Sequence, residues 1–110
     1  MDIDALIERL YAAEQPSRAL DQDVAKAFGW SFDKGSGRWS DERGRQADRA
    51  PFYTKSLHAI YAFASKVSPH GGASWEEGMG SAKLGDNPAV QAKTPEMALC
   101  IATLIYIRNN

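Results

Sequence analysis

The feature that most constrains the fold is an almost uninterrupted apolar segment near the end of the chain, residues 97–107. Among these residues only Thr103 is polar, whereas a helix on a protein surface shows a polar face along its whole length. The segment follows Thr94, Pro95 and Glu96, which form a typical helix start: a capping side chain, a proline at the first helical position and an acidic residue near the positive end of the helix dipole. We therefore expect a helix that is covered on most sides, by a sheet on one flank and by other helices on another.

The same segment is too short to cross a bilayer, because a membrane-spanning helix needs about 20 apolar residues. With 110 residues the chain has the length of one domain, and its charged fraction of 25% is ordinary for a globular protein. The net charge of −1 argues against a dedicated binder of duplex nucleic acid, which normally carries a basic domain. We therefore predict a single domain over residues 1–110, with no membrane partner and no duplex nucleic-acid partner.

Two amphipathic helices are expected before the first strands. In residues 3–11 apolar side chains recur at helical spacing, with Asp2 as a cap. A second helix is expected between Ser17, its cap, and Gly29, which suits the position just past a helix end. We assign the charged residues of both helices, including Asp21, to exposed outer faces, so each helix should cover the core on one side only.

A third helix is expected after Thr54, its predicted cap. Its predicted apolar stripe is Leu57, Ile60, Tyr61, Ala64 and Val67. The predicted strands are 30–33 and 38–40 as one hairpin, 73–77 and 81–84 as a second hairpin, and 89–92 as a further strand, with 41–50 as an exposed loop. Hairpins separated by helices favour an α+β fold, in which an antiparallel sheet is sandwiched by helices (an α/β/α sandwich) in the order α-α-β-β-α-β-β-α.

Several segments carry a resemblance to a known family. They are Phe28-Gly29-Trp30, residues 51–57 with the pattern Tyr-Thr-x-Ser-Leu, Trp75, and residues 92–102 with the pattern Thr-Pro-x-x-Ala-Leu-Cys. In these segments the chain resembles the phage alpha-beta-alpha sandwich domain, a family of small phage proteins. His58 departs from the family pattern, which has an acidic residue there. The resemblance implies a phage or prophage origin and a sandwich fold, and it implies no catalytic residues.

The patterns of common catalytic and cofactor sites are missing from the sequence. The glycine-rich turns at 35–37 and 78–80 lack the third glycine of a dinucleotide-binding loop, and no Gly-Lys-Ser/Thr phosphate loop occurs. His58, His70 and the single Cys100 do not have the spacing of a metal site, and Cys100 is interpreted as a buried apolar residue. Because no nucleophile, base and orienting group occur together, we expect no enzyme, no metal and no cofactor.

Four arginines lie close together before the third helix: Arg38, Arg43, Arg45 and Arg49. Because Asp41, Glu42 and Asp48 are interleaved with them, two interpretations stay open. The segment is either a solvated loop whose charges pair with one another, or a flexible lid whose guanidinium groups close on a phosphate. The aromatic residues nearby allow the same choice between core packing and stacking on a base. The candidate ligand-binding residues are Arg38, Trp39, Arg43, Arg45, Arg49, Tyr53 and Trp75.

These observations favour a non-enzymatic binding protein that sequesters a small nucleotide-type immune signal, as a phage counter-defence protein would. The alternative is an adaptor or inhibitor that docks on a host protein through a sheet edge or exposed aromatic residues. A single-stranded RNA partner ranks third. The acidic start of the chain shows no signal peptide, so we expect the cytoplasm of the infected bacterial host. We also expect a homo-oligomer, because small domains often build binding pockets at symmetric interfaces.

Overall fold

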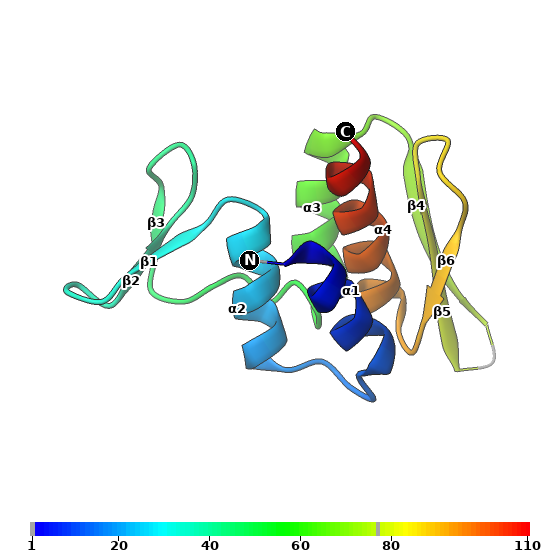
Figure 1. Ribbon diagram of the computed structural model, residues 1–110, viewed down its shortest axis with the longest axis horizontal. Helices are drawn as coiled ribbons and strands as arrows, with labels where there is room; N and C mark the ends of the chain where they lie inside the picture. Colours follow the sequence, from blue (N-terminus) through cyan, green and yellow to red (C-terminus); the bar gives the residue numbers. More distant parts are fainter. Residues whose placement is uncertain (1, 77) are drawn as a thin grey trace.

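The computed structural model describes residues 2–76 and 78–110, which form four helices and two three-stranded antiparallel sheets. In chain order the elements are α1 (Ile3–Ala12), α2 (Arg18–Ala27), β1 (Ser31–Asp33), β2 (Arg38–Ser40), β3 (Gln46–Ala47), α3 (Leu57–Val67), β4 (Gly71–Glu76), β5 (Met79–Leu84), β6 (Val90–Ala92) and α4 (Pro95–Asn109). The predicted α+β class and the four helices are confirmed (Figure 1).

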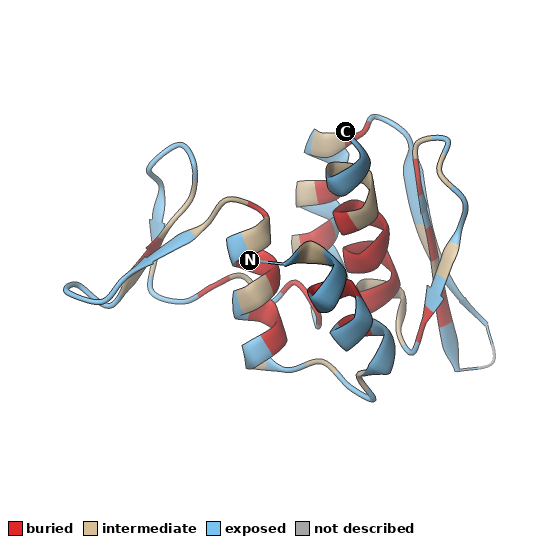
Figure 2. Cartoon of the chain, viewed as in Figure 1, coloured by how far each residue is buried: buried red, intermediate tan, exposed pale blue. Residues whose placement is uncertain are grey.

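Helix α4 lies at the centre of the molecule, as its composition predicts. Its residues from Met97 to Leu104 are all buried, and α4 packs against β5, β6 and β4 on one side and against α1 and α3 on the other (Figure 2). The hydroxyl of Thr103 donates a hydrogen bond to the Leu99 carbonyl at 2.7 Å, so the one polar side chain of this stretch is satisfied within the helix. Thr94 caps the helix by accepting a hydrogen bond from the Met97 amide at 3.1 Å. None of the helices in the described residues has both the length and the apolar character needed to cross a bilayer.

The sheet formed by β4, β5 and β6 packs one of its two faces on α4. The buried residues of β5 and β6 alternate with exposed ones, as a half-covered sheet requires. A Cβ atom at Gly80 would collide with the backbone of Thr94 and Pro95, so β5 approaches the start of α4 more closely than any other residue type allows. In the described part of the chain no helix lies on the opposite face, where Ser81 and Lys83 point outward, so the sheet is covered rather than sandwiched (Figure 1).

The other sheet, β1–β3, projects from the body of the molecule and differs from the single sheet expected from the sequence (Figure 1). The segment 41–50, expected to be a loop, contributes the two-residue strand β3. Phe32 faces Trp39 across the β1–β2 pair, with ring centroids 5.2 Å apart. These strands are too short and too polar to bury a face on α4, so only Trp39 among their residues is buried.

The caps of α1 and α2 are the predicted ones, Asp2 and Ser17, but the cap of α3 lies two residues later than predicted. Ser56 caps α3 by accepting a hydrogen bond from the Ala59 amide, whereas Thr54, the predicted cap, is fully buried. Within the predicted stripe of α3 only two residues, Ile60 and Ala64, are fully buried, and Tyr61 is 60% exposed. This part of the prediction was wrong because α3 covers α4 with a narrower face than the sequence pattern indicates.

Asp21 is the second correction, because only 1% of its surface is exposed although we expected it on an outer face. Its carboxylate accepts hydrogen bonds from the Thr54 amide at 2.8 Å and the Thr54 hydroxyl at 2.6 Å, and it pairs with Arg18 at 2.7 Å. Arg18 also donates to the Ala50 carbonyl at 2.8 Å. This network ties α2 to the segment that leads into α3, and it compensates the cost of burying a carboxylate.

Candidate functional site

A groove of about 460 Å³ opens between α3 and the turn that joins β2 to β3. We call this turn, residues 41–45, the Asp41–Arg45 turn. The volume lies within the range of about 300–1,000 Å³ that is usual for sites that bind small molecules. The groove has one wall from α3, one wall from the Asp41–Arg45 turn and an aromatic floor, and we describe these three parts in turn.

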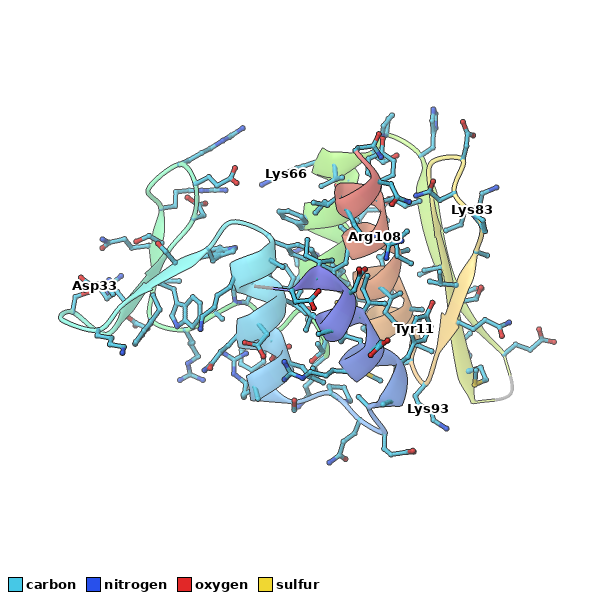
Figure 3. All side chains as sticks on the ribbon, viewed as in Figure 1. Tyr11, Asp33, Lys66, Lys83, Lys93 and Arg108 are labelled. Carbon is cyan, nitrogen blue, oxygen red and sulfur yellow. The ribbon has the colours of Figure 1, made fainter. Side chains whose placement is uncertain are left out.

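The wall from α3 is a stripe of side chains at helical spacing: Ala59, Ala62, Phe63, Lys66 and Val67. Residues at this spacing share one face of a helix, and on α3 this face lies beside the face that packs on α4. Lys66, near the end of α3, extends toward the side of the molecule that carries β1–β3 (Figure 3). The helix therefore supplies a mostly apolar wall with one cation at its far end.

The floor consists of aromatic rings that pack on one another. Phe28 stacks on Phe63 with centroids 4.0 Å apart and planes 8° apart, and it meets Tyr53 edge to face at 5.0 Å. The indole Nε1 of Trp30 donates a hydrogen bond to the Tyr53 hydroxyl oxygen at 3.1 Å. Burial raises the pKa of Tyr53, and the hydrogen bond from Trp30 only partly offsets this rise. The phenol is thus held in its neutral form and fixed in position.

The opposite wall, the Asp41–Arg45 turn, is organised by a single carboxylate. Asp41 accepts hydrogen bonds from the amides of Arg43 and Arg45 and from Nε of Arg45, each at 2.9 Å. Gly44 in the same turn has a φ of 83°, a conformation that favours glycine. Desolvation alone would raise the pKa of Asp41, but the hydrogen bonds from Arg45 and Arg43 outweigh it and lower this pKa below its usual value. The guanidinium of Arg45 is therefore engaged within the turn.

The turn is also held against the end of α2. Gly29, just past α2, has a φ of 102°, and a Cβ atom there would collide with the carboxylate of Glu42. The Glu42 side chain therefore rests directly on the Gly29 backbone. This contact and the hydrogen bonds of Asp41 define the shape of this wall; whether the segment closes as a lid stays a prediction.

The charges at the groove leave a net excess of one positive charge. Arg43, Arg45 and Lys66 are the cations that line it, and Asp41 and Glu42 are the anions. Arg45 and Asp41 form an ion pair at 2.9 Å, whereas no ion pair joins Arg43 or Lys66 to a carboxylate among residues 2–76 and 78–110. Arg43 and Lys66 are thus the two cations available to an anionic ligand.

The structure brings together three of the seven residues that the sequence singled out: Arg43, Arg45 and Tyr53. The others lie elsewhere. Arg38 pairs with Asp48 at 2.8 Å across the projecting sheet, Trp39 is buried against Phe32, Arg49 does not line the groove, and Trp75 is 76% exposed on β4. Three further residues of the groove, Phe28, Phe63 and Lys66, were not predicted from the sequence to bind a ligand. The helical spacing of residues 59, 62, 63 and 66 indicates that they share one face of α3. This face was missed because the sequence also shows a more apolar stripe on the same helix, and that stripe predicts the buried face.

Comparisons with protein-family models, with curated proteins and with solved structures found no match for this chain. The resemblance to the phage alpha-beta-alpha sandwich family therefore stays a prediction. Within residues 2–76 and 78–110, no group of three His, Cys, Asp or Glu side chains is arranged to hold a metal ion.

Proposed function

We propose that the protein is a binding protein that sequesters a small nucleotide-type ligand in the groove between α3 and the Asp41–Arg45 turn. The observation that supports this function is the presence of Arg43 and Lys66 beside partly exposed aromatic rings in one groove of suitable volume. A nucleotide has the complementary pair of features, an anionic phosphate and a flat aromatic base.

In this arrangement the phosphate lies toward Arg43, whose planar guanidinium can donate two parallel hydrogen bonds to phosphate oxygens. Lys66 supplies a second positive charge from the opposite wall. The base lies over the half-buried rings of Trp30 and Phe63, where stacking contributes about 1–3 kcal/mol for each base. Arg45 keeps its pairing with Asp41 and acts by holding the turn.

Binding is a better account of this groove than catalysis, because the groups that could act as base or nucleophile, Asp41 and Tyr53, are engaged in holding the structure. The Asp41 carboxylate accepts three hydrogen bonds from its own turn, and its lowered pKa makes it a weak base. Burial raises the pKa of Tyr53, which opposes formation of a nucleophilic phenolate. The family resemblance implies a phage or prophage origin; if the protein acts in counter-defence, as we propose, the ligand would be an immune signalling nucleotide.

Calorimetry and thermal shift against cyclic mononucleotides, cyclic dinucleotides and ADP-ribose test the proposal. A ligand present at 100 times its dissociation constant should stabilise the protein by about 2.7 kcal/mol. Adenosine and ribose 5-phosphate are the matched probes, since each lacks one of the two recognised features, and both should bind more weakly than the intact nucleotide. Flat responses across the whole panel would contradict the proposal.

The decisive variant is Arg43→Ala, with Arg49→Ala as its control, because Arg49 belongs to the same segment but lies outside the groove. A hydrogen bond to a charged group contributes about 1.5–3 kcal/mol, so R43A should weaken binding by about tenfold to a hundredfold. R49A should leave the dissociation constant unchanged. Equal losses in the two variants would indicate non-specific attraction by the arginine-rich segment.

A protein–protein adaptor is the second candidate function, and the exposure of Trp75 favours it. Trp75 belongs to the sheet β4–β6, on the other side of α4 from the groove (Figure 1). The two candidates are therefore separable: a nucleotide trap depends on Arg43 and not on Trp75, whereas an adaptor depends on Trp75 and not on Arg43.

A further inference from the structure

Strand β4 forms an edge of the sheet β4–β5–β6 and leaves one side of its backbone unpaired with another strand. It has six residues, contains neither proline nor lysine, and pairs with β5 in an unbroken register from Gly71 to Glu76. Proteins usually protect such edges with prolines, charges, bulges or very short strands. The opposite edge follows that rule, because β6 has three residues, is preceded by Pro88 and runs almost directly into α4.

The two ends of β4 differ in shape. Gly71 lies at its start, and Trp75, which is 76% exposed, lies near its end. Both face the side of the sheet that carries α4, because their partners across the ladder, Leu84 and Gly80, are buried there. The first end has no side chain of its own and is covered by Leu84, whose Cδ1 would lie 2.7 Å from a Cβ atom on Gly71. The second end carries a large apolar side chain with little cover.

A small crevice of about 50 Å³ adjoins the Gly71 end. It is lined by Tyr61 and Ala64 of α3, by Gly71, and by Leu84 of β5. Tyr61 is 60% exposed, so the crevice has an uncovered aromatic ring at its rim. An apolar side chain placed opposite Gly71 would lie against this rim.

We propose that β4 pairs with β4 of a second copy of this chain, in antiparallel orientation, to form a symmetric dimer with a continuous six-stranded sheet. In such a pair the twofold axis passes between one residue and its own copy. With Ala73 at the axis, the partner's Trp75 lies opposite Gly71, beside the Tyr61 crevice. There the ring would pack against the Leu84 side chain, which covers Gly71, and against Tyr61.

Charge supports the same register. The ladder extends one residue before β4, because the Gly85 amide donates to the His70 carbonyl at 2.7 Å. With Ala73 at the axis, the partner's Glu76 lies opposite His70 on the outer face of the sheet, where an imidazole N–H can donate to the carboxylate. An axis at Ser74 would instead place the partner's Trp75 opposite Ala73 and the partner's Glu76 opposite Gly72, and both complementary contacts would be lost.

The dimer would leave the nucleotide groove free, because α4 and α3 separate the groove from β4 (Figure 1). This inference therefore does not depend on the proposed function. Each dimer would carry two independent grooves, with all helices on one side of the six-stranded sheet.

Analytical ultracentrifugation across a concentration series measures the association directly. We expect a reversible monomer–dimer equilibrium, and a protein that remains monomeric at the highest attainable concentration would overturn the proposal. Trp75→Ala should weaken dimerisation by about tenfold or more, as is usual for a central aromatic residue. Tyr11→Ala is the matched control, since Tyr11 is another exposed aromatic residue on α1, away from β4, and it should change nothing.

A charge exchange tests the register. His70→Glu should weaken the dimer a few-fold by placing two carboxylates opposite each other, and His70→Lys should strengthen it a few-fold. The double variant H70E with Glu76→Lys should restore association to at least the original level. Failure of the double variant to recover, with each variant retaining the circular dichroism spectrum and melting temperature of the original monomer, would rule out an axis at Ala73.

Discussion

The body around α4 and the projecting sheet β1–β3 are held together by different forces. The body buries apolar side chains from α1, α3, α4 and the sheet β4–β6 in one core. The projecting sheet contributes only Trp39 to the core. Asp41 holds the Asp41–Arg45 turn through hydrogen bonds within the turn, and the Glu42 side chain lies against the Gly29 backbone at the end of α2. The groove lies where these two regions meet, so one wall depends on hydrophobic burial and the other on hydrogen bonds.

The largest difference between the two regions should appear when one large side chain is removed from each. Leu104→Ala deletes a fully buried side chain of α4 and should reduce the free energy of unfolding by about 2–5 kcal/mol. Phe32→Ala in the projecting sheet should cost only about 1 kcal/mol, because Phe32 is 44% exposed and its main contact is Trp39. Urea denaturation measures both values, and equal losses would show that the projecting sheet belongs to the same core.

The next largest effect concerns the buried polar network that ties α2 to the segment leading into α3. Asp21→Ala removes the acceptor for the Thr54 amide and hydroxyl, which are buried, and should cost about 2–3 kcal/mol. Asp23→Ala is the control, because Asp23 pairs with Arg9 at the surface and such a pair contributes about 0–1 kcal/mol. Urea denaturation again gives the values. If the two variants lost the same stability, the buried network would contribute no more than a surface ion pair.

The sequence predicts the body far better than the site. The apolar run of α4, the caps Asp2 and Ser17, and the hairpin of β4 and β5 are visible because they depend on local patterns and on hydrophobic periodicity. Asp21 escaped prediction because its partner Thr54 lies 33 residues away, and no local pattern distinguishes a buried aspartate from an exposed one.

The groove shows the same limitation. Arg43, Arg45 and Arg38 look equivalent in the sequence. Only the structure shows that Arg45 pairs with Asp41, that Arg38 pairs with Asp48, and that Arg43 forms no ion pair within residues 2–76 and 78–110. The aromatic residues divide in a similar way. Trp39 and Trp75 are separated from the groove because the strands form two sheets rather than one, and a sequence pattern does not report how strands are distributed between sheets.

The smallest expected effect is a pH dependence confined to the Asp41–Arg45 turn. The lowered pKa of Asp41 in the folded protein means that its carboxylate stabilises the turn fully above its ordinary pKa of 3.8. That contribution is lost as the pH falls below 3.8 and through the lowered folded-state value, because a protonated carboxyl accepts hydrogen bonds from Arg43 and Arg45 more weakly. The amide resonances of Arg43 and Arg45 in NMR spectra should therefore shift together in this acidic range.

The comparison is sharpened by Asp41→Asn, which keeps a side-chain oxygen acceptor but cannot ionise. In this variant the acid-dependent shift of the two amide resonances should disappear. The amides of α4 should show no such transition in either protein, because their environment depends on apolar burial rather than on a titrating group. A transition that begins in α4 at the same pH as in the turn would mean that the projecting sheet and the body respond to acid as one unit, and the division between them would be wrong.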